Sequence, residues 1–317
     1  PEGLQSRWPQ IRTYRILDVE NPLYGGRLTV TRHGITALYT SAQGEIFLEP
    51  YGTNQSRYHV AYYNHDVVLT PDDLPQFACG YEPAEAETHE PAKTETSGGL
   101  EKSSIPAEIH LYNMALTCTG EYAQQKGGTI ESVLESFVTA MNIANATFER
   151  EVGVRVQLIE DQELLVYLNA STDPFINADN GGGLLGQVQG ALTGAGVPTT
   201  AYDMGHVFTS GCTDVGGVVG GQVCTPGKDR GVTCHYTNNI TAIIRRVFTH
   251  EVAHQFAVAH SWSNCPGNDG QLASGSAYEP GSGTTIMSYA GSCGTQNIAF
   301  NNDDYYHGHS LEQFIFF

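Results

Sequence analysis

The stretch HEVAHQFAVAH, residues 250–260, decides the interpretation of the whole chain. His250 and His254 are four residues apart, so on a helix their side chains lie one turn apart on the same face. Two imidazoles in that arrangement can bind one tetrahedral metal ion at about 2.0–2.1 Å. Glu251 is rotated by about 100° from His250, so it can lie over an open metal position without being a ligand.

His260 completes the pattern under one condition. In a continuous helix it would lie well off the shared face, so it becomes a third ligand only if the chain turns sharply near Ala257. Three neutral ligands and one open position are typical of a catalytic zinc site. A helix is indicated because apolar residues recur at helical spacing just before the motif: Ile240, Ile243, Ile244, Val247 and Phe248.

A surface helix that carries histidines by chance is the alternative, because HExxH alone is not a specific signal. The third histidine and the downstream segment Thr285-Ile286-Met287-Ser288-Tyr289 argue against it. Together they resemble the metzincin zinc endopeptidases, with Met287 in the Met-turn. Four segments are similar to the bacterial reprolysin-like (M12B-type) branch, and the resemblance extends from about Ile109 onward: 202–208, 227–232, 250–256 and 286–291.

The resemblance implies an α/β fold, a metzincin-like twisted mixed sheet with a long active-site helix. It also implies Zn²⁺ held by His250, His254 and His260, with Glu251 moving the proton during hydrolysis of a protein or peptide substrate. The strand at residues 205–210 would line the cleft. Metzincins usually have glycine where this chain has Ala257, and alanine in the same turn would cost about 1–2 kcal/mol.

Two further site residues follow from the resemblance. Met287 would pack beneath the zinc as an apolar floor, although a lone methionine more often fills an ordinary core. Tyr289 is similar to the tyrosine of astacins and serralysins that contacts the zinc or the transition-state oxyanion, and a packed aromatic is the alternative role.

Composition narrows the class of protein. The 317 residues suit one large domain or two modest ones, and no apolar run approaches the 20 residues of a membrane span. The net charge of −19 argues against a nucleic-acid surface and fits a secreted, extracellular protein. We expect a monomer.

The chain divides into three parts. Residues 1–81 hold short β-branched and aromatic runs between turn signals, which predicts a small β-rich pro-domain. In residues 82–106, glutamates alternate with Pro, Ala, Thr, Ser and Gly without apolar periodicity, which predicts a flexible acidic linker. Lys93 and Lys102 offer an activating protease its cleavage sites there. Residues 107–317 form the catalytic domain.

Six of the seven cysteines fall in the part that carries the zinc motif, and three disulfides among them would imply an oxidising compartment: Cys118, Cys212, Cys224, Cys234, Cys265 and Cys293. The seventh, Cys79, lies in Phe77-Ala78-Cys79-Gly80, which resembles the cysteine switch of metzincin pro-regions. Its thiolate would occupy the fourth metal position and keep the enzyme latent. A buried thiol without that role is the alternative.

Other functions remain open at this stage. A non-enzymatic adhesion or binding module could keep a zinc-stabilised protease fold, although such a protein has no need of Glu251. The same metal site could serve another hydrolysis. The run Asn301–Asp304 offers oxygen ligands for a possible Ca²⁺ ion, and a solvated acidic loop is its alternative.

Overall fold

The computed structural model describes residues 1–21, 24–52, 57–67, 79–80, 108–235 and 243–317. The linker predicted at 82–106 lies outside the described residues. After a short helix α1 (Glu2–Arg7), the N-terminal part forms a five-stranded antiparallel meander in chain order. The strands are β1 (Arg12–Leu17), β2 (Gly25–Thr31), β3 (Gly34–Ser41), β4 (Gly44–Pro50) and β5 (His59–Tyr63), followed by η1 (Asn64–Asp66).

The turn residues explain the tight meander. Gly34 and Gly44 open β3 and β4 with φ of 122° and 115°, a backbone region that favours glycine. Leu38 and Phe47 lie opposite each other on β3 and β4, and both are buried. The other face of the sheet is partly exposed, so the meander is a one-sided sheet that needs a partner for its apolar face.

The second sheet is mixed, as predicted. Its order is β7-β6-β8-β10-β9, and β9 alone runs antiparallel to its neighbour. The strands are β6 (His110–Cys118), β7 (Val154–Leu158), β8 (Met204–Thr209), β9 (Gly217–Val219) and β10 (Gly231–Cys234). Short helices connect them: α2 (Gly120–Gln125), η2 (Gln162–Leu165), α4 (Gly181–Leu184), α5 (Val188–Gly194) and η3 (Thr199–Ala201).

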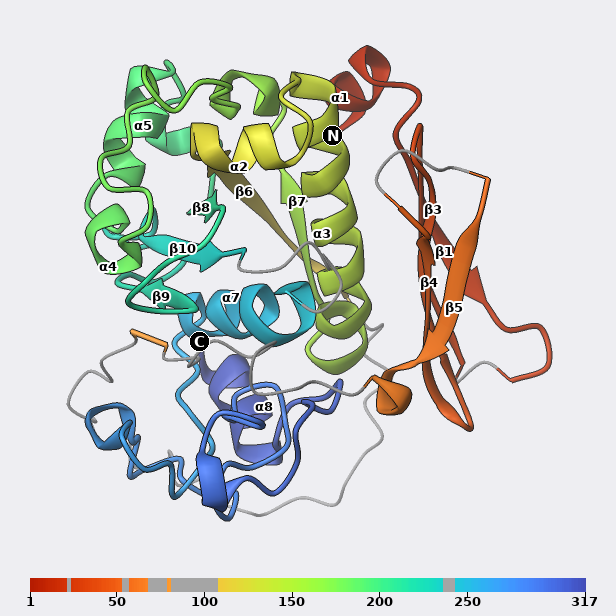
Figure 1. The fold of residues 1–317 in the computed structure, drawn as a ribbon, viewed down its shortest axis with the longest axis vertical. Coiled ribbons are helices and arrows are strands. Elements are labelled where there is room, and N and C mark those ends of the chain that lie inside the picture. Colours follow the sequence, from red (N-terminus) through yellow and green to blue (C-terminus); the bar gives the residue numbers. More distant parts are fainter. Residues whose placement is uncertain (22–23, 53–56, 68–78, 81–107, 236–242) are drawn as a thin grey trace, which may run out of the picture.

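The long helix α3 (Ile130–Glu151) lies between the two sheets (Figure 1). Thr129 caps its first turn in a reciprocal capping box with Ser132. On one side, the Phe137 ring meets that of Phe208 on β8 at 5.7 Å. On the other side, Asn142 donates to the carbonyl of Leu28 on β2 at 3.0 Å. Because both flanks are covered, α3 joins the N-terminal sheet to the mixed sheet.

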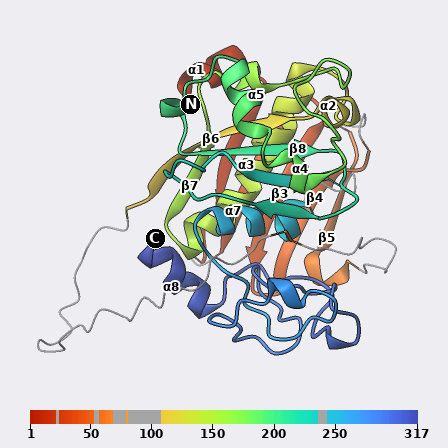
Figure 2. The same ribbon diagram turned by 90° about the vertical axis from the view of Figure 1, so that its left-hand side faces the viewer.

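The helix that carries His250 and His254 is continuous from Ile244 to Gln255. Its first part, η4 (Ile244–Phe248), is π-helical, and α7 (Thr249–Gln255) completes it. The C-terminal residues lie below α7, in both Figure 1 and Figure 2, and contain η5 (Asp269–Gln271), η6 (Gly294–Gln296) and α8 (Gly308–Phe316). Within the described parts of the chain, no helix combines the length and the hydropathy needed to cross a membrane.

Two disulfides form after residue 107, where the cysteine count had suggested three. Cys212 pairs with Cys234, and Cys265 pairs with Cys293. Cys118 is buried at the end of β6, whereas Cys224 is exposed. A cysteine count cannot anticipate which side chains the fold brings within disulfide reach.

Ala257 provides a test of the turn after α7. Its φ is +62°, in the left-handed region where an L-residue with a Cβ is strained. We expect Ala257→Gly to raise the free energy of unfolding by about 1 kcal/mol, because relief of strain outweighs the added entropy of the unfolded chain. Ala257→Val is expected to lower it. Urea unfolding measures the free energy of unfolding of both variants. A glycine variant less stable than the parent would contradict the strained conformation of Ala257.

Candidate active site

Three histidine side chains converge beyond the end of α7. The Nε2 atom of His254 lies 3.0 Å from Nε2 of His250 and 3.1 Å from Nε2 of His260. All three side chains are fully buried. The positive φ at Ala257 brings His260 back to the helix, which is the sharp turn that the sequence required.

The backbone decides which ring nitrogen of each histidine carries its proton. Nδ1 of His250 bonds the carbonyl of Ile286 at 2.8 Å, and Nδ1 of His254 bonds that of Val258 at 2.6 Å. Nδ1 of His260 bonds the carbonyl of Gln271 at 2.9 Å. Because a carbonyl only accepts, each Nδ1 donates and each Nε2 presents a lone pair to the common centre.

The donor set fits a metal ion. Three lone pairs that face one another without a proton repel, and a cation between them removes that repulsion. Tetrahedral zinc–nitrogen bonds place neighbouring nitrogens about 3.3 Å apart, close to the separations found here. Burial lowers the pKa of His250 to about 4 and that of His260 to about 3, so both rings stay neutral. Burial also holds the pKa of His254 well below its usual value.

Glu251 lies beside the histidines and is fully buried. Its Oε2 accepts a 3.4 Å hydrogen bond from the Cys79 thiol. Burial raises the pKa of Glu251 well above its usual value, and the Cys79 contact opposes that rise. Gly217 on β9 gives this carboxyl its space, because a Cβ there would meet Oε1 of Glu251 at 2.4 Å.

Cys79 occupies the remaining side of the site. Its Sγ and a nitrogen of each of the three histidines all lie within 4.8 Å of one another, the one cluster of this kind among the described residues. The backbone around it pairs with the edge strand β9, since Gly80 N donates to Gly217 O at 3.0 Å and Cys79 forms a parallel bridge with Gly217. Cys79 and the three histidines therefore form a tetrad that can surround one ion.

Tyr289 contacts the same segment. Its hydroxyl accepts from the backbone N–H of Cys79 at 3.0 Å and also bonds the Gln271 side-chain oxygen. Its ring packs against that of His260 at 4.8 Å. Gln271 thus serves the site twice, because its carbonyl orients His260 and its side chain holds Tyr289. No sequence motif marks Gln271, so sequence reasoning missed it.

Met287 is fully buried in the main apolar core. Its carbonyl accepts from Ser261 N at 3.1 Å, and the preceding carbonyl, of Ile286, accepts from His250. Buried Glu279 ties the same turn, accepting from Thr284 N at 2.8 Å and Thr285 N at 3.1 Å. The segment 285–289, where the Met-turn was predicted, therefore lies against the histidines through the carbonyls of Ile286 and Met287.

Two expectations about the surroundings need correction. The strand at Met204–Thr209 is an inner strand of the sheet, and the edge strand β9 lines the site instead. A three-residue strand gives too little pattern to be found in a glycine-rich stretch. The possible calcium site is also not supported, because the Asp304 carboxylate pairs with Arg150 at 3.1 Å and Asn302 donates to Thr285 O.

No curated protein sequence is significantly similar to the chain. Solved structures that match include one entitled "Structure of a chaperone-substrate complex", which is 10% identical with a TM-score of 0.33. The match covers 96% of this chain and 40% of that one, and at that score it has no bearing on fold or function.

One protein-family model matches residues 109–314, about two thirds of the chain, and its description is metallo-peptidase family M12B, reprolysin-like. The matched range contains the three histidines, Glu251 and Met287. The chain belongs to the reprolysin-like M12B metallopeptidases.

Proposed function

We propose that the protein is a secreted zinc endopeptidase, held as a latent proenzyme by Cys79. The observation that carries the proposal is the tetrad: one thiol from the N-terminal part and three histidine nitrogens around a common centre, beside Glu251. The same observation supports residues 1–81 as a pro-domain and 107–317 as the catalytic domain. Two disulfides are compatible with an extracellular location.

His250, His254 and His260 would hold the zinc ion, which supplies a Lewis acid and brings the pKa of a bound water near 7. Glu251 takes the proton of the attacking water and delivers it to the leaving nitrogen. Tyr289 presents its hydroxyl where the oxyanion develops.

β9 positions the substrate. Its edge already pairs with Cys79 and Gly80, so the extended backbone of a peptide can pair with it in the same way. The Cys79 segment lies along that edge, and its thiol would take the fourth ligand position of the zinc ion. Its removal therefore opens the substrate groove and the position of the attacking water in one step.

Glu251→Gln tests catalysis. The amide keeps the shape but cannot take a proton, so kcat/KM should fall by about 10²–10⁴-fold, while the bound zinc stays near one per chain. The assay is cleavage of a quenched peptide library in a Cys79→Ser background, with metal content measured in parallel. A variant that cleaves as fast as its parent would rule out this role and favour another use of the site.

Zinc removal tests the metal site. Without the ion, three lone pairs face each other in a dry interior, so we expect zinc at about 1,000 times its dissociation constant to stabilise the fold by about 4 kcal/mol. Thermal unfolding of chelator-treated protein, with and without added zinc, measures this. His254→Ala should lose most of the response, and an equal response in that variant would place the zinc elsewhere.

Cys79→Ser tests latency. A serine hydroxyl is a weaker zinc ligand than a thiolate, so the uncut variant should be at least about tenfold more active than the uncut parent. Relief should be partial, because Gly80 still bonds β9. Cys118→Ser changes a second buried free cysteine, one that lies outside the tetrad, so this matched control should stay latent. A fully active uncut parent would exclude a cysteine switch.

A further inference from the structure

The face of α3 that meets the N-terminal part carries a line of polar side chains, called its polar face here, beside the apolar Leu134 and Val138. Glu131, Glu135, Asn142 and Glu149 recur at spacings of four and seven, which places them along one side of the helix. The opposite side, with Phe137 and its apolar neighbours, packs on the catalytic sheet. A helix covered permanently on both sides has no need of a carboxylate-rich face.

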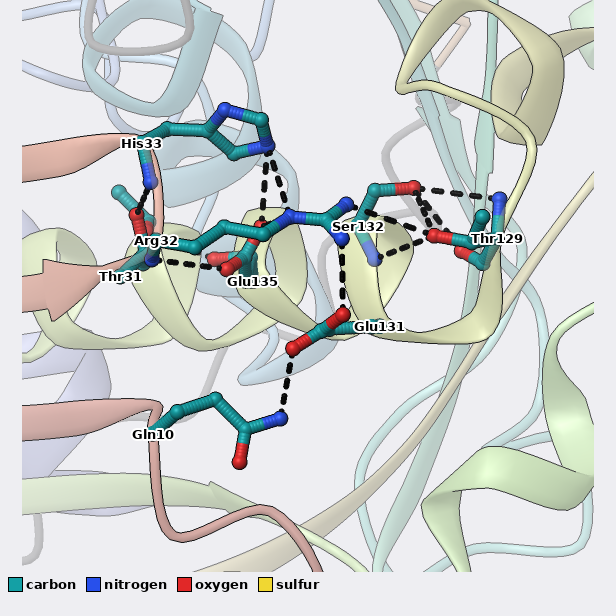
Figure 3. Close-up of polar contacts among 9 residues, drawn as sticks. Gln10, Thr31, Arg32, His33, Thr129, Glu131, Ser132 and Glu135 are labelled. Carbon is teal, nitrogen blue, oxygen red and sulfur yellow. Dashed lines mark hydrogen bonds and ion pairs between the residues drawn. The ribbon is translucent and has the colours of Figure 1, made fainter. Parts of the chain in front are cut away.

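The turn between β2 and β3 supplies the partners of these carboxylates (Figure 3). Arg32 pairs with Glu131 at 2.8 Å and with Glu135 at 3.3 Å, and its backbone N–H donates to Glu135 at 3.1 Å. His33 Nε2 lies 3.3 Å from the same Glu135 carboxylate. The side chain of Glu135 is only 5% exposed, so this carboxylate is buried by the sheet that also neutralises it.

Further ion pairs cross the same boundary. Arg7 pairs with Glu163, Arg27 pairs with Glu149, and Glu45 pairs with Arg245 at 2.9 Å. In all but the last pair the N-terminal residue is the cation. Residues 107–317 contain seven Lys and Arg against twenty Asp and Glu, a net −13, whereas residues 1–81 contain six against eight. The strongly acidic catalytic part thus meets the arginine-bearing side of a nearly neutral partner.

The apolar part of this boundary is limited. Leu4, Ile11, Leu38 and Phe47 join the main core. A cavity of about 350 Å³ nevertheless remains between α1 and β1 on one side and α3 and β7 on the other, with Arg15 and Asn145 among its lining residues. Incomplete packing and many ion pairs are typical of interfaces that can separate, because permanent interfaces are more apolar and more tightly packed.

Cys79 lies on the sheet side of the 82–106 linker, thirteen residues after Asp66 at the end of the meander. A cut within the linker therefore leaves the thiol attached to the sheet. While the sheet stays on α3, the short connection keeps Cys79 near the histidines at an effective concentration on the order of millimolar.

We propose that the polar face of α3 is a docking surface for the N-terminal sheet that outlasts cleavage of the linker, so that the nicked chain remains a salt-sensitive, latent two-piece complex. The inference rests on the proposed function and adds its regulation. Cleavage is then necessary for activation, and separation of the sheet from α3 completes it.

The experiment uses the full chain with a specific protease site placed within residues 91–104. After complete nicking, size-exclusion chromatography with light scattering measures whether the two pieces co-elute at 20 mM NaCl and at 500 mM NaCl. Between these two salt levels the electrostatic screening length falls from more than about 10 Å to a few Å. Peptide cleavage is measured on the same fractions. We expect co-elution and latency at low salt, and separation with at least tenfold higher activity at high salt.

Charge reversal makes the test specific. Arg32→Glu places a negative charge against Glu131 and Glu135. The dissociation constant of the two nicked pieces should therefore rise at least tenfold at low salt. Adding Glu131→Arg restores one opposite-charge pair and should recover part of the docking. Arg57→Glu is the matched control, because Arg57 is exposed and makes no ion pair among the described residues. Thermal unfolding of each uncut chain verifies that the variants are folded.

The outcomes separate the two proposals. Pieces that part at once at low salt, with activity, would overturn the docking surface and leave the protease proposal intact. A complex unchanged at 500 mM NaCl and indifferent to Arg32→Glu would also overturn it. Docking is measured by elution and does not depend on peptidase activity. If the catalytic piece separates at high salt, binds zinc and still cleaves no peptide, the result counts against the proposed function and leaves the docking surface intact.

Discussion

The structure depends on bringing three neutral imidazole lone pairs to one point in a dry interior. The carbonyls of Ile286, Val258 and Gln271 accept from the three Nδ1 atoms and so aim the three Nε2 atoms inward. Those carbonyls come from the Met-turn, the turn after α7 and the loop at η5. The site therefore prescribes how the C-terminal segments fold back onto the active-site helix, and a cation at the centre would stabilise all of them together.

The turn at Ala257 shows how strong that requirement is. A left-handed alanine is unfavourable by about 1–2 kcal/mol, yet the chain adopts it because His260 cannot otherwise reach the other two histidines. Phe256 and Val258, on either side, are buried in the main core, which holds the strained residue in place. Local strain is thus offset by packing around it.

Sequence reasoning recovered the features that depend on local spacing. The proximity of His250 and His254, the turn before His260 and the N-terminal meander follow from periodicity and turn residues. It failed where the answer depends on long-range pairing. β9 is three residues long and is recognisable only by its pairing with β10. Gln271 belongs to no sequence motif. Which cysteines form the two disulfides follows from distances that the fold sets.

The double role of α3 is the least local feature of all. Its apolar spacing predicts one buried face, and that face meets the catalytic sheet. Its second face is buried only because arginines some hundred residues earlier in the chain lie against its glutamates. Burying Glu135 is unfavourable unless Arg32 and His33 stay in place. Burial raises the pKa of Glu135, and the contacts with Arg32 and His33 oppose that rise. Once those partners leave, water can solvate the same carboxylates, so the helix surface suits both the covered and the uncovered state. A purely apolar face would suit only the covered one.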